Sequence, residues 1–374
     1  MWKKVLLAIG VLVIVVLGGA YVFLNQPDIP RAVLEKKYAV APSQFVTLPD
    51  GARVHYRDRG PRNAPVLLLL HGSNSSLFDW EPWSKILSNL PLNADKDVAY
   101  ATEIGMGIKA THLSEWEKAL LIEQMRSKMH WDRWRIISVD LPGHGLTGAV
   151  PNGDYSEQGM TIFVKAFADK LGLTHFAIGG NSMGGGVAAR FAEEYPDRVT
   201  GLILVDAHTE GMAPSGDRIP FAFRLARMPV ANQLFLFITP RSLVVEGLND
   251  AIVRKAALTD AMIDQYWDFA RMAGTRRATL ARFQLPPDTY VRDHIAAIKA
   301  PTLILWGSDD HLIPVAAAHN WAKAIKGSKL VIYPATGHLP MEEVAAESAA
   351  KVRAFLSTQG RWHLHYEIRM SSKP

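Results

Sequence analysis

Residues 176–194, FAIGGNSMGGGVAARFAEE, decide the fold of this chain. A short apolar run at 176–178 leads into Gly180-Asn181-Ser182-Met183-Gly184, and a helical pattern follows at 184–194. At a sharp turn from strand to helix, side chains larger than hydrogen would clash at the two flanking positions, so glycine is needed there. The turn holds the serine between them in a strained conformation with its hydroxyl exposed. The stretch therefore predicts a nucleophile, Ser182, above the carboxyl ends of the strands; a plain glycine-rich turn is the alternative.

Five more apolar runs have the same character and lie at 66–70, 136–139, 202–205, 302–306 and 330–333. Short runs without a polar face are typical of strands that are covered on both sides. Helical patterns such as 160–171 separate them. Residues 45–48 and 52–57 flank Pro49-Asp50-Gly51, which predicts a hairpin. Strands that alternate with helices predict an α/β fold with a mostly parallel sheet.

Two segments interrupt this alternation. Residues 208–298 carry helical patterns and no convincing strand, so they predict a helical cap between the core segments 28–207 and 299–358. Residues 85–132 form a long insertion. If 78–87 is the first core helix, the insertion lies at the edge of the sheet; if 114–129 is that helix, the insertion is a second lid.

The two ends of the chain predict further segments. Lys3 and Lys4 precede an uninterrupted apolar run at 5–24, long enough as a helix to span a hydrocarbon core of about 30 Å. Residues 1–27 are therefore expected to be an N-terminal membrane helix with the catalytic domain outside the cytoplasm. A cleaved signal peptide, and thus a secreted protein, is the alternative, because Gly18-Gly19-Ala20 offers a cleavage site. Residues 359–374 are expected to form a tail beyond the last helix.

Composition excludes several classes of function. The 374 residues carry a net charge of +5 that is spread along the chain, so nucleic acid is not an expected partner. Since the chain has no cysteine, it has no disulfides, zinc knuckles or thiol nucleophile. Gly143-x-Gly145-x-x-Gly148 satisfies the dinucleotide fingerprint, but the loop-forming Pro151-Asn152-Gly153 follows where a helix should begin. Neither a cofactor nor a metal is expected.

A serine nucleophile needs a base that is held in orientation by an acid. Trp306-Gly307-Ser308-Asp309-Asp310 follows one apolar run, and Gly337-His338-Leu339-Pro340 follows the last. Three strand ends in the order serine, aspartate, histidine predict a triad of Ser182, Asp310 and His338.

Two other aspartates compete for the role of the acid. Asp309 is adjacent to Asp310, but the D-x-x-x-P spacing to Pro314 favours Asp310. Asp206 directly follows the run at 202–205 and is the second alternative.

Two motifs complete a resemblance to a known family. His71-Gly72-Ser73-Asn74 resembles the His-Gly oxyanion motif of the α/β-hydrolase superfamily, and Asp140-Leu141-Pro142-Gly143-His144-Gly145 resembles its D-x-x-G-x-G turn. Together with the serine motif, they make the chain similar to capped serine esterases and lipase-like members over about residues 44–84 and 133–357. The resemblance implies an eight-stranded sheet with a helical cap. It also implies an oxyanion hole made by the backbone N–H groups of Ser73 and Met183.

The resemblance implies hydrolysis of a small-molecule carboxylic ester through an acyl-enzyme. Asn181-Ser182-Met183-Gly184-Gly185 also resembles hydrolases that cleave carbon–carbon bonds in ring-fission products. Those usually have an aromatic residue where this chain has Leu339, and a glycine-rich stretch where it has Asn74-Ser75-Ser76. A perhydrolase-like activity and a non-catalytic, membrane-anchored binding role are further alternatives. The apolar residues of the cap predict either a pocket for an apolar ester or simply the cap's own core.

Overall fold

The computed structural model describes residues 25–88, 134–212, 231–234 and 236–371, together with the single positions 2, 10, 19 and 228. Within these residues, eight strands form one sheet in the order β1-β2-β4-β3-β5-β6-β7-β8. Their bounds are β1 Ser43–Thr47, β2 Arg53–Arg59, β3 Val66–Leu70, β4 Arg135–Val139, β5 Phe176–Asn181, β6 Val199–Val205, β7 Thr302–Gly307 and β8 Lys329–Tyr333. The β1–β2 hairpin is antiparallel, β2 is antiparallel to β4, and all other neighbours are parallel. The predicted eight-stranded, mostly parallel sheet is confirmed.

Both faces of the central sheet are buried, which explains the apolar runs. Successive residues of a strand point to opposite faces. Leu68 and Leu70 therefore join the cluster under helices α6, α7 and α14, whereas Leu67 and Leu69 join the cluster under α3 and α16. Burial of a leucine side chain contributes roughly 2 kcal/mol. A strand that is covered on both sides gains stability from the burial of every apolar residue. Its sequence therefore lacks the alternation of apolar and polar residues.

The first four core helices connect consecutive strands, and the last two follow β8. Their bounds are α3 Glu81–Ser88, α6 Glu157–Lys170, α7 Met183–Glu194, α14 Val315–Ala324, α15 Pro340–Glu343 and α16 Ala345–Ser371. Single 3-10 turns lie at Leu77–Trp80 and Pro196–Arg198. Helix α3 follows β3 and packs against α16, as the first interpretation of residues 78–87 predicts. The rest of the predicted insertion, residues 89–132, lies outside the described residues.

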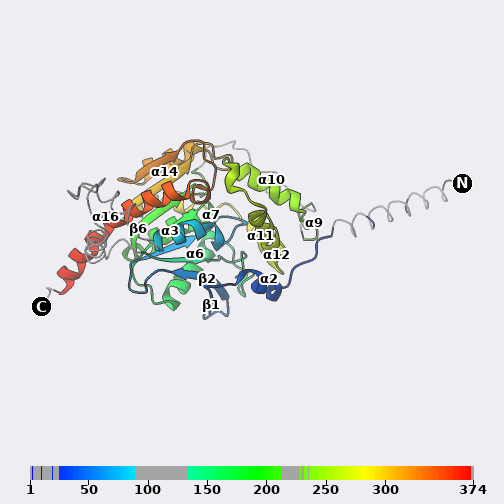
Figure 1. Ribbon diagram of the computed structural model, residues 1–374, viewed down its shortest axis with the longest axis horizontal. Coiled ribbons are helices and arrows are strands. Elements are labelled where there is room, and N and C mark those ends of the chain that lie inside the picture. Colours follow the sequence, from blue (N-terminus) through cyan, green and yellow to red (C-terminus); the bar gives the residue numbers. More distant parts are fainter. Residues whose placement is uncertain are drawn as a thin grey trace, which may run out of the picture.

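A helical cap lies between β6 and β7. Its helices are α9 Ala231–Leu234, α10 Arg241–Ala251, α11 Asp260–Ala270, α12 Thr275–Phe283 and α13 Tyr290–His294, with 3-10 turns at Lys255–Ala257 and Ile295–Ala297. No strand occurs among the described residues of 208–298. Figure 1 shows α10, α11 and α12 grouped at the end of the molecule opposite the C-terminal part of α16.

Residues 25–43 lead into the sheet and contain helix α2, Arg31–Tyr38, which the sequence did not predict. Leu34 is the one buried residue of this helix and packs in a cluster with Phe269 and Met272 of the cap region. Lys37 binds Asp268 in an ion pair of 2.7 Å. One buried side chain in eight residues leaves almost no periodic pattern in the sequence, and the partners are more than 200 residues away.

The last helix also differs from the prediction. Helix α16 continues to Ser371, so a tail that begins at residue 359 beyond the final helix is wrong. The segment contains one glycine and no proline before Pro374, and the other residue types are compatible with helix continuation.

The predicted membrane helix at residues 1–27 falls almost wholly outside the described residues. Among the residues that were described, no helix is both long enough and apolar enough to cross a bilayer.

Candidate active site

The turn between β5 and α7 carries Ser182 in an unusual backbone conformation, with φ 52° and ψ −122°. Non-glycine residues rarely adopt positive φ, and such strain is concentrated at functional sites. A Cβ at Gly180 would lie only 2.1 Å from the carbonyl oxygen of Gly184, and one at Gly184 only 2.4 Å from that of Leu70. Both glycines are therefore required by space, as the motif predicts. Ser182 itself is only half-buried.

His338 and Asp310 form a buried pair. The Nδ1 atom of His338 lies 2.7 Å from Oδ2 of Asp310, and the side chains are 6% and 0% exposed. The other oxygen of Asp310 accepts hydrogen bonds from the backbone N–H groups of Leu312 and Ile313, at 2.8 and 3.0 Å. Three donors thus stabilise the ionised carboxylate and fix the orientation of the imidazole.

Asn181 joins the turn of Ser182 to the loop of His338. Its side-chain amide donates hydrogen bonds to the carbonyl oxygens of His338 and Val205, at 3.0 and 3.2 Å. Because Asn181 directly precedes Ser182, the hydroxyl and the imidazole are carried by two loops that are bonded to each other. The sequence analysis did not identify this role. The only signal was a buried amide in an otherwise apolar strand.

The structure separates Asp310 from its neighbour Asp309. Asp309 is exposed, and its carboxylate accepts a hydrogen bond from the hydroxyl of Ser308 at 3.0 Å. Only the next carboxylate along the chain contacts His338. Of the two adjacent acids, Asp310 is the one that the fold brings to the histidine.

The His71–Ser73 turn lies against the turn of the nucleophile. A Cβ at Gly72 would lie 3.1 Å from Cβ of Ser182 and 2.8 Å from Oδ1 of Asn181. The hydroxyl of Ser73 donates to the sulfur of Met183 at 3.6 Å. Met183 is the first residue of α7, where a helix leaves backbone N–H groups without an intrahelical acceptor. The two residues predicted to form an oxyanion hole are therefore neighbours beside Ser182.

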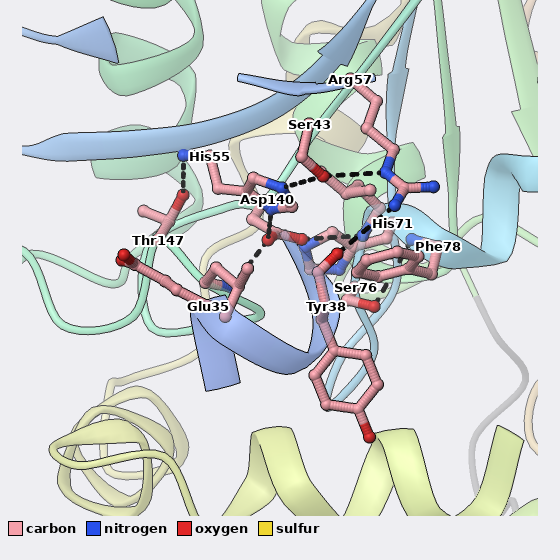
Figure 2. A network of polar contacts seen from close by, with 12 residues as sticks. Glu35, Tyr38, Ser43, His55, Arg57, His71, Ser76, Phe78, Asp140 and Thr147 are labelled. Carbon is pink, nitrogen blue, oxygen red and sulfur yellow. Dashed lines mark hydrogen bonds and ion pairs between the residues drawn. The ribbon is translucent and has the colours of Figure 1, made fainter. Parts of the chain in front are cut away.

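A buried network fixes the loop that leads out of β3 (Figure 2). Asp140 accepts hydrogen bonds from the backbone N–H groups of Leu77 and Leu146, both at 2.8 Å, and pairs with Nδ1 of His55 at 2.6 Å. The backbone N–H of Leu141 donates to Nε2 of His71 at 3.0 Å. The D-x-x-G-x-G turn therefore clamps both ends of the segment 71–77, which includes Ser73.

The same network contains a second chain of contacts from an aspartate through a histidine to a serine. His55 lies between Asp140 and the hydroxyl of Ser43, which is 2.9 Å from Nε2 (Figure 2). Arg57 donates to this hydroxyl at 3.1 Å, and both His55 and Asp140 are fully buried. A hydroxyl that is already engaged by a guanidinium beneath helix α2 is unsuited to attack a substrate, so this group serves the structure.

Asp206, the alternative acid, lies behind Asp310. It is fully buried, has φ 44°, and accepts a hydrogen bond from the backbone N–H of Gly307 at 3.0 Å. One carboxyl oxygen each of Asp206 and Asp310 and one ring nitrogen of His338 lie within 4.8 Å of one another, as the ligands of a metal ion would. Burial and the charge of Asp310 raise the pKa of Asp206 well above its usual range. A neutral acid and a histidine that is already bonded to a carboxylate are poor ligands for a cation.

The cap reaches the site through Tyr266 of α11. Its hydroxyl lies 2.9 and 2.8 Å from the two carboxylate oxygens of Asp79 and 3.2 Å from the hydroxyl of Ser75. Burial raises the pKa of Asp79 to about 6, although hydrogen bonds from Ser75 and Tyr266 and the nearby His338 oppose the shift. Nothing in the sequence connects residues 79 and 266, so this link could be found only from the structure.

Comparison with known proteins defines the class. The profile of the alpha/beta hydrolase fold family matches residues 105–344. The chain belongs to this family, and it is a hydrolase.

Individual relatives span nearly the whole chain. The 2-hydroxy-6-oxononadienedioate/2-hydroxy-6-oxononatrienedioate hydrolase of Escherichia coli (strain K12) is 26% identical over 325 residues, 85% of this chain and 96% of that protein. Among solved structures, a bacterial membrane phospholipase A has a TM-score of 0.63 at 21% identity and covers 96% of this chain and 99% of its own. A putative lipase from Acinetobacter baumannii AYE has a TM-score of 0.64 at 20% identity, with 90% and 99% covered. At these identities the two structures bear on the fold alone.

Proposed function

We propose that the protein is a serine hydrolase that cleaves a carboxylic ester through an acyl-enzyme. The observation that carries this proposal is the strained turn of Ser182, φ 52°, bonded through Asn181 to the loop of His338. His338 is in turn held by Asp310 at 2.7 Å. Nucleophile, acid and base would thus follow β5, β7 and β8 of one sheet, at the same edge.

In the proposed reaction, the hydroxyl oxygen of Ser182 attacks the ester carbonyl carbon while Nε2 of His338 takes its proton. The carbon–oxygen bond of the leaving alcohol breaks, and the alkoxide receives that proton. Water then attacks the acyl-enzyme with the same histidine as base, and releases the carboxylic acid and free Ser182. Asp310 stabilises the imidazolium in both steps.

The negative oxygen of each tetrahedral intermediate would be bound by the backbone N–H groups of Ser73 and Met183. Loss of one oxyanion donor typically costs about 3–4 kcal/mol of transition-state stabilisation. The close contact of Gly72 with Ser182 supports this assignment. The buried network around Asp140 supports it as well, because a pre-positioned donor needs no rearrangement during reaction.

The decisive experiment is active-site labelling. A fluorophosphonate probe should label the wild-type protein and not Ser182→Ala, and hydrolysis of p-nitrophenyl acetate should fall by at least about 10⁴-fold in the variant. Ser328→Ala is the control and should label normally. Ser328 directly precedes β8, at the opposite end of that strand from the loop of His338. An unlabelled wild type would favour a non-catalytic binding role.

A carbon–carbon bond hydrolase is the second candidate, because the Escherichia coli relative bears the name of such an enzyme over 85% of this chain. Two features favour the ester instead. Leu339, 4% exposed, occupies the position after the base, and Asn74-Ser75-Ser76 replaces a glycine-rich stretch. Parallel assays with p-nitrophenyl esters and a 2-hydroxy-6-oxo-dienoate decide between the two: faster turnover of the dienoate would overturn the ester assignment.

Residues 1–27 are proposed to anchor the protein, with the hydrolase domain outside the cytoplasm. The support is the pair Lys3-Lys4 before twenty apolar residues. Membrane proximity would favour apolar esters. Fractionation tests the anchor: recovery of full-length protein from the cytosol contradicts it, and a shortened protein in the medium indicates cleavage. Turnover of p-nitrophenyl esters that rises with acyl length would support an apolar pocket, and a flat profile would oppose it.

A further inference from the structure

Asp206 extends the line of polar groups behind His338. It follows β6 with φ 44° and is fully buried, and its Oδ1 accepts the backbone N–H of Gly307 at 3.0 Å. Its carboxyl lies beside that of Asp310: one oxygen of each carboxyl and a ring nitrogen of His338 all lie within 4.8 Å of one another.

Two carboxyl groups in buried contact do not both ionise at neutral pH. Asp310 has three donors, from Leu312, Ile313 and His338. Asp206 has one, and its Oδ2 receives no hydrogen from the part of the protein that the structure describes. The negative charge is more stable where the donors are, so it belongs to Asp310 and the shared proton to Asp206.

We infer that Asp206 is a positioning residue of the reaction: as a neutral carboxylic acid, it donates a hydrogen bond from Oδ2 to the carboxylate of Asp310. That bond orients Asp310 and withdraws part of its negative charge from His338. Asp206 thereby acts on the basicity of the imidazole through Asp310. The inference rests on the proposed function, and it assigns Asp206 a part beside Asp310 rather than in competition with it.

The other ionisable groups that face Asp206 do not replace it. Glu343 already accepts hydrogen bonds from the backbone N–H groups of Val253, Arg254 and Gly337, at 2.9, 2.7 and 2.9 Å. Burial raises the pKa of Tyr333, which keeps the phenol neutral. Among the described residues, Asp206 remains the one acidic neighbour that is placed to donate a hydrogen bond to Asp310.

Asparagine reproduces the hydrogen bonding of a neutral Asp206. Its oxygen can accept from Gly307, and its NH₂ can donate to Asp310. Alanine offers neither. If Asp206 is neutral, Asp206→Asn leaves the charge around His338 unchanged, whereas Asp206→Ala exposes His338 to the full charge of Asp310 and raises its basicity.

The test is the pH profile of kcat/KM for p-nitrophenyl acetate, measured from about pH 5 to about pH 9 with wild type and both variants. The acid limb of Asp206→Asn should coincide with that of the wild type, and that of Asp206→Ala should move up by about one pH unit. Glu193→Gln, which removes another buried carboxyl far along α7, is the control and should not move the limb.

Two results would overturn the inference. A downward shift in Asp206→Asn would mean that an ionised Asp206 stabilises the imidazolium. If the acid limb of the pH profile were the same in both variants as in the wild type, Asp206 would have only a packing role. A wild type without turnover or labelling is a different failure, that of the proposed function.

An infrared measurement tests the inference without catalysis and without the alanine variant. With carbon-13 aspartate, the wild type at about pH 8 should show the carbonyl band of a protonated carboxylic acid, because Asp79, with a pKa of about 6, is ionised there. Asp206→Asn should remove this band and Asp79→Asn should keep it. A missing band in the wild type contradicts a neutral Asp206.

Discussion

The phenol of Tyr266 in the cap donates to the carboxylate of Asp79 in the core, with its oxygen 2.8 and 2.9 Å from the two acceptor atoms. Asp79 lies in the 3-10 turn after the oxyanion loop, and it is 2% exposed. Ser75, within that loop, donates to the same carboxylate. One buried acid therefore connects the helix that covers the site with the segment that contains Ser73.

Tyr266→Phe should loosen this connection. Removal of one donor from a buried carboxylate costs about 1–3 kcal/mol, so the free energy of unfolding in urea should fall by that amount. We expect kcat/KM for esters to fall as well, by about tenfold, because the oxyanion loop loses a restraint. Tyr56→Phe removes a hydroxyl that bonds Gln44 at the edge of the sheet and should leave kcat/KM unchanged. Equal turnover in the two variants would contradict the link.

Asp79 should give the protein a specific pH dependence of stability. Its pKa is raised from 3.8 to about 6 in the folded protein, so the folded state holds its proton more tightly than the unfolded state. The contribution of this group is therefore most favourable below about pH 4 and is lost as the pH rises through about 6, by roughly 3 kcal/mol.

Asp79→Asn should remove this loss. The variant should gain stability relative to the wild type between about pH 4 and about pH 7 by an amount of that order, as measured by urea unfolding at both values. Asp309→Asn changes an exposed aspartate and should show no such gain. A difference between Asp79→Asn and wild type that is independent of pH would argue against the raised pKa.

Asp310 and Asp309 offer a matched pair for the acid. Asp310→Asn should lower kcat by about 10⁴-fold, because an amide no longer stabilises the imidazolium and favours the wrong tautomer. Asp309→Asn should change kcat by less than about twofold, since exposed substitutions away from the site are nearly neutral. Near-normal turnover by Asp310→Asn would show that another group, with Asp206 the first candidate, can act as the acid.

Gly72→Ala tests the contact between the oxyanion loop and the nucleophile. The added Cβ would lie 2.8 Å from Oδ1 of Asn181 and 3.1 Å from Cβ of Ser182, so the loop must move. A displaced oxyanion donor should lower kcat by about 10²–10³-fold with little change in KM. Gly247→Ala in helix α10 is the control. An added Cβ there would meet no other part of the structure within 4 Å, so the variant should retain full activity.

The sequence predicted those parts of the fold whose cause is local. The run at 66–70 forms β3 with the same bounds, and Gly180 is required by its contact with the backbone of Gly184, four residues further along. The order of Ser182, Asp310 and His338 along the chain follows from the order of the parallel strands. Both predictions concern residues whose place is specified by the strand or turn that carries them.

The parts that could not be predicted depend on distant partners. Asn181 bonds a carbonyl 157 residues away, and Tyr266 bonds an acid 187 residues away. Helix α2 is stabilised by the cap rather than by a pattern of its own. A neutral Asp206 follows from the number of donors around each carboxylate, and only coordinates supply that number.

The segment 25–38 fastens to the cap before the chain enters the sheet. The backbone N–H of Gln26 donates to the carbonyl of Phe237, and Ile29 forms a bridge with Met272. A pulling force on the chain before residue 25 would therefore act on the cap first. It would reach the strands of the sheet only through the cap. A tether at that end would set the orientation of the cap toward whatever surface holds it.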